Sequence, residues 1–97
     1  LIVGDHPHCL QRLDYVGGVP VIYSMGNFWF NSKTVNTGLL QYTINKNGTP
    51  DIKFIPCLQK DCKTTLLSRA DGASLLDYMR NISQNVSIDA DGNVTAK

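Results

Sequence analysis

The pair Asn47-Gly48 constrains the fold of this chain most strongly, because it separates two runs of alternating apolar and polar residues. The runs are Thr37–Lys46 and Asp51–Gln59. Asparagine and glycine tolerate the positive φ of a tight turn, and a period of two is typical of half-buried strands. An antiparallel hairpin is therefore predicted here. Leu40, Tyr42 and Ile44 are expected to share one face, and Ile52, Phe54 and Pro56 one face of the partner strand.

A second hairpin is predicted around Gly17-Gly18, which separates the run Gln11–Val16 from the run Val19–Ser24. Only glycine adopts positive φ at little steric cost, so paired glycines favour a short turn between strands. Pro20 has no N–H to donate to a ladder. We therefore expect it at the start of its strand or on an open edge.

The segment Asp71–Gln84 predicts the one helix, with Asp71 as N-cap. Its apolar residues recur at helical spacing. They are Leu75, Leu76, Met79 and Ile82. The tail Asn85–Lys97 is compatible with a small terminal hairpin or with frayed chain.

The apolar run Leu1–Val3 predicts the end of a fully buried strand, closed by Gly4. Because such a strand stands here without a lead-in, we expect the chain to be a piece of a larger protein. Asp5–Gln11 is expected to form a loop or one helical turn, in which Pro7 biases the preceding residue towards extended backbone. Asn31–Asn36 is polar and is expected to be a loop.

Length and composition indicate one folded domain at most, since the chain has 97 residues, of which 42% are hydrophobic and 18% charged. The net charge of +1, without clustered Lys and Arg, argues against a nucleic-acid-binding protein. No apolar run approaches the ~20 residues of a membrane span. Free thiols are favoured for Cys9, Cys57 and Cys62, with a local disulfide between the last two left open.

The sequence G-D-H-P-H at residues 4–8 is the best candidate for chemistry. It follows an apolar strand, and ligands gather beyond the carboxyl ends of strands in open α/β sheets. Neutral imidazoles are common metal ligands, so His6 and His8 are candidates to bind one metal ion. The alternative is a purely structural role, in which both histidines lie on the surface or pack against the protein. Further ligands are lacking nearby, so the chain alone supplies about half of a site.

Two later residues have both a structural and a functional interpretation. Asn27, in a turn beside Gly26, commonly adopts αL backbone or an Asx turn, but its side chain could orient the histidine loop or a ligand phosphate. Trp29, between Phe28 and Phe30, most often means core packing. An exposed Trp29 could instead stack on a ligand or partner.

Two motifs in fixed order resemble the CapA family of bacterial capsule proteins. Residues 3–11 read V-G-D-H-P-H-C-L-Q, beside the family pattern G-H-H-P-H-V-x-Q. Residues 23–30 read Y-S-M-G-N-F-W-F, beside Y-S-L-G-N-F-V-F-D. The resemblance covers roughly residues 1–59, because the hairpin that follows, with its F-I-P ending, is also similar. Residues 60–97 carry little family signal.

This family is similar to the calcineurin-like metallophosphatases, which are α/β sandwiches of two β-sheets with flanking helices and a metal centre at the strand ends. The resemblance implies that residues 1–97 are a single fragment from the C-terminal portion of such a domain. As an isolated fragment it would be an α+β chain of hairpins with one helix. By resemblance, His6 and His8 would bind a divalent metal (Mn, Fe or Zn) in the full-length parent. Four residues would shape that site: Gly4, Asp5, Gly26 and Asn27.

The chain departs from the family pattern at three positions. Asp5 replaces the first histidine of the common triplet, which leaves H-x-H intact. Cys9 stands where Val is usual, and Asn31 where Asp is usual. The N-terminal metallophosphatase motifs (D-x-H, G-D and G-N-H-E) are absent. The resemblance therefore implies a fold half and part of a site, and it assigns no catalytic residue.

The resemblance implies a role in biosynthesis or export of the poly-γ-glutamate capsule at the bacterial cell surface, with a membrane anchor in a region outside this chain. Two alternatives stay open: a metallophosphoesterase of a small phosphorylated substrate, and a non-catalytic assembly module. The resemblance is compatible with a metal-dependent hydrolase as the parent, and the fragment alone is expected to be inactive. Expected partners are the N-terminal part of the same domain, the polymer and other capsule-synthesis proteins. Exposed strand edges predict a dimer or a strand-swapped form in isolation.

Overall fold

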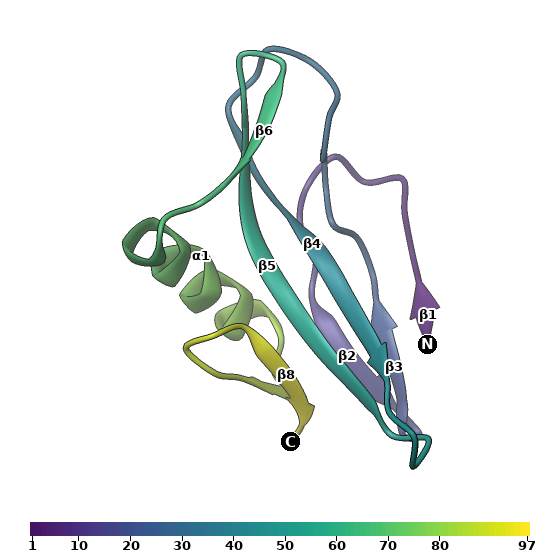
Figure 1. The fold of residues 1–97 in the computed structure, drawn as a ribbon. Coiled ribbons are helices and arrows are strands. Elements are labelled where there is room, and N and C mark those ends of the chain that lie inside the picture. The colour runs from purple at the N-terminus through teal and green to yellow at the C-terminus, as the bar shows by residue number, and fades with distance from the viewer.

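The computed structural model describes residues 1–97 as two β-sheets and one helix around one core (Figure 1). The fold is α+β and consists mainly of hairpins, as predicted. The three-stranded sheet has the order β1 (Ile2–Val3), β3 (Val19–Ile22), β2 (Leu13–Val16). The five-stranded sheet has the order β4 (Val35–Ile44), β5 (Pro50–Lys60), β8 (Asn93–Ala96), β7 (Val86–Ile88), and β6 (Lys63–Leu66) also pairs with β5. The helix α1 spans Arg69–Ile82.

The hairpin of β2 and β3 confirms the glycine-pair prediction. Gly17 and Gly18 have φ of 57° and 79°. Pro20 is the second residue of β3 and pairs with Tyr15 of β2. On the other side of β3, the parallel pairing with β1 begins only at Val21. Pro20 therefore lies where β1 has not yet begun, so its missing N–H breaks no bond between them.

The hairpin of β4 and β5 is also confirmed and is longer than predicted. Its register runs from Val35 opposite Gln59 to Ile44 opposite Pro50. The loop expected over Asn31–Asn36 therefore ends before Val35, because β5 extends far enough to pair with that residue. Ile44, beside the turn, is 73% exposed, so the predicted apolar face is not buried at this end of the hairpin.

One hydrophobic core joins both sheets and the helix. The small sheet and the loop before it contribute Leu10, Leu13 and Ile22, which are 5% exposed or less. At its centre, Phe54 of β5 is fully buried, and a Cβ on Gly38 would stand 2.6 Å from its ring. The other core residues come from β5, α1, β7 and β8: Ile52, Leu75, Leu76, Met79, Val86, Ile88 and Val94.

The helix begins earlier than predicted. Ser68, and not Asp71, is the N-cap, and its hydroxyl oxygen accepts a hydrogen bond from the Asp71 N–H at 3.2 Å. A serine three residues upstream can reach this otherwise unpaired N–H, which leaves the Asp71 carboxylate to interact with the positive helix end. No helix in the structure has the length and apolar character needed to cross a bilayer.

The C-terminal tail forms a hairpin, which decides between the two expectations for it. Its strand β8 pairs with β5, with Val94 opposite Ile52. The three cysteines are free, as favoured by their spacing. Cys57 is buried, and burial raises the pKa of its thiol.

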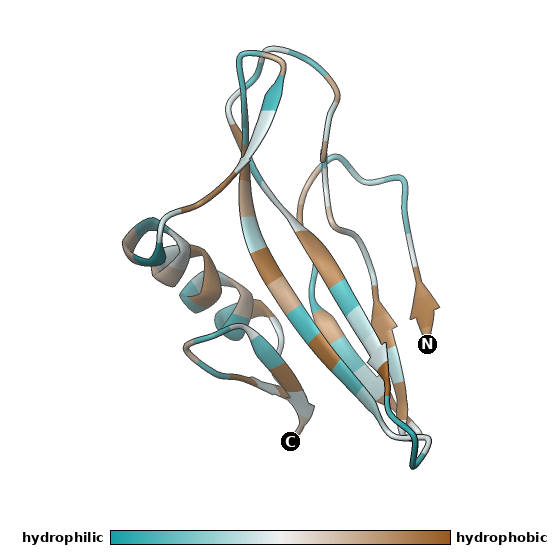
Figure 2. Cartoon of the chain, in the orientation of Figure 1, coloured by the Kyte–Doolittle hydropathy of each residue, from teal (hydrophilic) through white to brown (hydrophobic).

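The prediction of a buried N-terminal strand is wrong for this chain. Leu1, Ile2 and Val3 are 45%, 57% and 57% exposed. They lie at the free edge of the small sheet, where β1 forms an apolar strip at the N-terminus (Figure 2). Nothing in these 97 residues covers this edge, although its residues are of the type that prefers to be buried.

A buried carboxylate connects the first hairpin with the segment that follows the helix. Asp14 of β2 is 7% exposed. It accepts hydrogen bonds from the Asn85 amide at 3.0 Å and from the Tyr15 N–H at 2.8 Å, and it lies 3.5 Å from the Arg12 guanidinium. The bond from Asn85 is the main cause that lowers the pKa of Asp14 below its ordinary 3.8.

We therefore predict acid-sensitive stability that depends on Asp14. Because its pKa is lower in the folded state, its contribution is present above the ordinary pKa and is lost as the pH falls through the lowered value. Asp14→Asn should lower stability at neutral pH and flatten the acid limb, measured by urea unfolding across pH. Asp61→Asn, at an exposed turn, controls for the lost charge. An unchanged acid limb in Asp14→Asn would contradict this prediction.

Candidate metal-ligand loop

The histidine loop leaves β1 through a position that only glycine can occupy. The Gly4 N–H donates to the carbonyl of Ile22 at 2.6 Å. A Cβ on Gly4 would stand 2.5 Å from the carbonyl oxygen of Tyr23, closer than real Cβ contacts. The start of the histidine loop is therefore held against the end of β3.

Ser24 joins the histidine loop to the Gly-Asn turn. It is 1% exposed, and its hydroxyl donates to the carbonyl of Pro7 at 3.1 Å and accepts from the Gly26 N–H at 3.1 Å. The Gln11 N–H donates to the Ser24 carbonyl at 3.0 Å. The buried Ser24 side chain thus links the two sequence motifs through hydrogen bonds to both.

Gly26 provides the close approach between these segments. Its φ is 71°, and a Cβ there would lie 3.1 Å from the backbone of both Cys9 and Leu10. Gly26, rather than Asn27, holds the left-handed conformation of this turn. This leaves the Asn27 side chain free for another role.

Asn27 contacts His8 directly. Its Oδ1 lies 2.7 Å from Nδ1 of the His8 imidazole. An amide oxygen only accepts hydrogen bonds, so Nδ1 carries the proton and donates. In the neutral ring this leaves the lone pair on Nε2 available. A hydrogen bond of this kind fixes ring orientation and tautomer in metal-ligating histidines.

His6 and Asp5 are less constrained than His8. The His6 backbone has φ of 103°, so the expected extended conformation before Pro7 is wrong. The Asp5 carboxylate accepts from the His6 N–H within the loop, which accounts for the turned backbone. The His6 imidazole is exposed. No group of three His, Cys, Asp or Glu side chains that could hold a metal ion occurs in this chain.

The aromatic segment after the turn lies on the surface and not in the core. Phe28, Trp29 and Phe30 are 44%, 66% and 55% exposed. The Phe30 ring lies 4.6 Å from the His8 imidazole, centroid to centroid, with the planes tilted by 49°. His8 is therefore held by Asn27 on its ring edge and by Phe30 beside the ring.

Gln59 of β5 supports this segment through its side chain, and the sequence analysis did not single it out. It is fully buried. Its side-chain oxygen accepts from the Phe30 N–H, and its amide donates to the Lys33 carbonyl at 2.9 Å. The only sequence signal for this role is that Gln59 is a polar residue within an apolar strand pattern. A buried polar side chain needs hydrogen-bond partners, and here these are backbone groups of Phe30 and Lys33.

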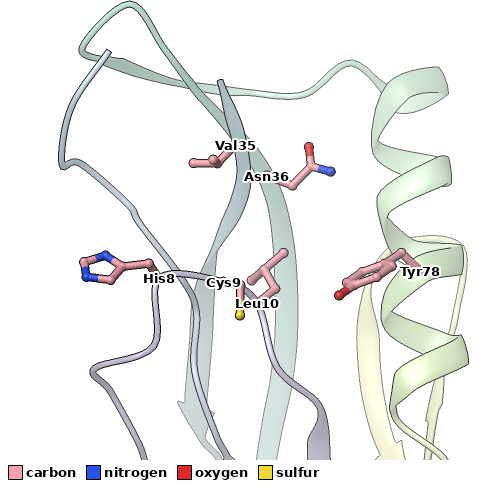
Figure 3. A pocket seen from close by; sticks show the side chains of 6 residues that line it. All are labelled: His8, Cys9, Leu10, Val35, Asn36 and Tyr78. Carbon is pink, nitrogen blue, oxygen red and sulfur yellow. The ribbon is translucent and has the colours of Figure 1, made fainter. Parts of the chain in front are cut away.

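A pocket of about 220 Å³ adjoins the loop (Figure 3). His8, Cys9 and Leu10 of the histidine loop line it together with Val35 and Asn36 of β4 and Tyr78 of α1. The His8 imidazole points away from Tyr78 in this view, so the histidine borders the pocket at its edge.

Comparison with known proteins shows what the first third of this chain resembles. The family described as "Bacterial capsule synthesis protein PGA_cap" matches residues 1–32, which include both motifs joined by the bond between His8 and Asn27. Residues 1–32 of this chain are therefore similar to a family of capsule synthesis proteins. Relatives of the chain include the "PGA biosynthesis protein CapA" of Bacillus subtilis (strain 168), 39% identical over 59 residues, and the "Capsule biosynthesis protein CapA" of Bacillus anthracis, 42% identical over 60 residues.

The match covers only a small part of each CapA relative. It spans 58% of this chain in both cases, but 16% of the Bacillus subtilis protein and 14% of the Bacillus anthracis protein. No solved structure matches the chain. The metallophosphatase-like parent fold and the residues of its site therefore stay predictions.

We predict that Asn27 sets the tautomer of His8. In the unmodified chain, nitrogen NMR of the neutral imidazole should show the proton on Nδ1. Asn27→Ala removes the acceptor and should shift His8 towards the Nε2-protonated form, which unconstrained histidine prefers. Asn81→Ala, exposed on α1, serves as the matched control. An unchanged tautomer in Asn27→Ala would refute the assignment.

Proposed function

We propose that this chain contributes the H-x-H metal-ligand loop of a CapA-like protein that acts in poly-γ-glutamate capsule biosynthesis or export at the bacterial cell surface. The observation that carries the proposal is the bond between His8 and Asn27. It joins, through side chains, the two motifs on which the family match rests. A bond of that kind suits a ligand whose ring must be held in one orientation.

The donor set fits part of a metal centre. His6 and His8 would hold a divalent metal, and His8 would use Nε2 because Nδ1 is engaged by Asn27. When bound, such a metal would supply a Lewis acid and an activated water for hydrolysis. The work of this chain is to orient: Ser24 and Gly26 fix the loop path, and Asn27 fixes the ring.

We further propose that the remaining ligands come from the N-terminal part of the same domain, packed along β1. Strand β1 is apolar; one of its edges pairs in parallel with β3, and the other is free. Strands in parallel sheets are normally buried on both faces. The same region would carry the membrane anchor. The polymer and other capsule-synthesis proteins would be the further partners.

Replacing the matched segment in the Bacillus subtilis relative by residues 1–59 of this chain tests the proposal. The chimera, produced in a poly-γ-glutamate-forming bacterium and purified without chelator, should contain near-stoichiometric Mn, Fe or Zn and sustain polymer output. The His6→Ala/His8→Ala chimera should lose both, and Asn27→Ala should weaken metal binding by about 10–100-fold. Thr43→Ala, exposed on β4, is the control.

The outcomes separate the alternatives. Metal and polymer output that persist in His6→Ala/His8→Ala would overturn the ligand assignment. Polymer output without metal in the unmodified chimera would favour the non-catalytic assembly role. Metal with hydrolysis of a small phosphorylated substrate but no polymer output would favour the phosphoesterase.

We predict that the 97-residue chain alone forms a dimer or a strand-swapped species, because the β1 edge presents unpaired backbone groups and apolar side chains. Sedimentation velocity measures this. Ile2 is 57% exposed on this edge. Ile2→Lys places a charge there and should shift the population to monomer. A compact monomer at all concentrations would contradict the prediction.

A further inference from the structure

Two hydrogen bonds tie the aromatic segment, residues 28–30, to the hairpin of β5 and β6. The Thr64 hydroxyl of β6 donates to the Phe28 carbonyl, and the Trp29 indole N–H donates to the carbonyl of Cys62 at 2.7 Å. The tip of this hairpin and the connection from β3 to β4 both lie at the upper end of the molecule (Figure 1). Because the three residues of the segment are between 44% and 66% exposed, packing alone does not fix their place. Hydrogen bonds therefore determine where the segment lies.

A third attachment comes from Gln59 of β5. Its side-chain oxygen accepts from the Phe30 N–H, and its amide donates to the Lys33 carbonyl at 2.9 Å. Gln59 is fully buried. A buried amide without hydrogen-bond partners is costly, so the burial of Gln59 favours the arrangement in which the backbone of residues 30–33 lies against it.

Gln59 and Thr64 act from the same face of the hairpin. They stand directly opposite each other in the register of β5 and β6, and the side chains of directly opposed residues project to the same side of a sheet. The register is closed by a two-residue turn at Asp61 and Cys62, whose φ values are 51° and 60°. One face of a tight hairpin thus holds the aromatic segment at both of its ends.

The attached segment and the residue before it carry both groups that hold the His8 imidazole. Asn27 directly precedes the segment, and its Oδ1 lies 2.7 Å from Nδ1 of His8. Phe30 ends the segment, and its ring centroid lies 4.6 Å from that of the imidazole. A shift of the segment would therefore move both contacts of His8 at once.

We infer that Gln59 and Thr64 are positioning residues for His8, which act on the imidazole through the backbone of the aromatic segment. The inference gives a role to a hairpin outside the family match, because the family model ends at residue 32. It rests on the proposed function for its purpose, since a metal ligand needs one fixed ring orientation. The hydrogen bonds that carry the inference are independent of any metal.

Nuclear magnetic resonance of the 97-residue chain, without metal, measures the placement of His8. In the unmodified chain, the His8 ring protons should show nuclear Overhauser contacts to the Phe30 ring and a ring-current shift. Thr64→Val removes the donating hydroxyl at nearly constant volume and should cause the loss of most of both signals. Thr64→Ser keeps the hydroxyl and should restore them.

Two further variants complete the test. Gln59→Leu removes both bonds to the segment and should cause the same loss, together with a shift of His8 towards the Nε2-protonated tautomer, because Asn27 moves with the segment. Thr65→Val is the matched control, since Thr65 is the exposed next residue of β6 and its side chain projects to the other face. It should leave the His8 signals unchanged. Circular dichroism checks that each variant is folded, and the Thr64 variants decide the outcome if Gln59→Leu does not fold.

Three results in folded variants would overturn the inference: unchanged His8 signals in Thr64→Val, an equal loss in Thr65→Val, or no restoration by Thr64→Ser. None of these measurements uses metal, so a chimera without metal would overturn the proposed function and leave this inference standing. Unchanged His8 signals in Thr64→Val, beside a metal-loaded chimera, would overturn the inference alone.

Discussion

Strand β5 is the constraint on which both the core and the histidine loop depend. Its middle contributes Ile52 and Phe54 to the core, and its far end places Gln59 against the backbone of the aromatic segment. It pairs with β4, β6 and β8. Loss of its register by one residue would turn Phe54 out of the core and remove Gln59 from Phe30 and Lys33. Stability and site geometry are therefore set by the same strand pairing.

The support of the histidine loop comes from backbone contacts between segments that are separate in sequence. Gly4 and Gly26 leave room where a Cβ would collide with backbone, and Ser24 holds the spacing between the two motifs. His8 then receives its orientation from Asn27 and Phe30. The outcome is one imidazole that is well defined and a second, His6, whose direction depends on the turned backbone.

The sequence predicted the hairpins well because their turns need residues with special backbone freedom. Gly17, Gly18 and Gly48 all have positive φ in the structure. It also predicted the helix core, because helical periodicity extends over several turns. The helix is capped at Ser68 and not at Asp71, since these two polar residues, three positions apart, can each cap a helix and the local pattern does not rank them.

What could not be predicted depends on tertiary contacts. The exposure of β1 depends on what packs beside it, which an apolar run does not reveal. Strand β6 and the support from Gln59 arise because β5 continues beyond its alternating pattern into a tight turn at Asp61 and Cys62. The bond between His8 and Asn27 joins residues 19 positions apart, so neither motif alone indicates it.

The contacts of β2 with the end of the chain affect the order of folding. The Leu13 N–H donates to the Ser83 hydroxyl and Asp14 accepts from Asn85, across 70 and 71 residues. Contacts between such distant residues are formed late, because the loop between them must first be closed at an entropic cost. During synthesis, the first hairpin therefore leaves the ribosome long before its partners. Until they follow, the inward residues of this hairpin stay exposed to contact with other chains.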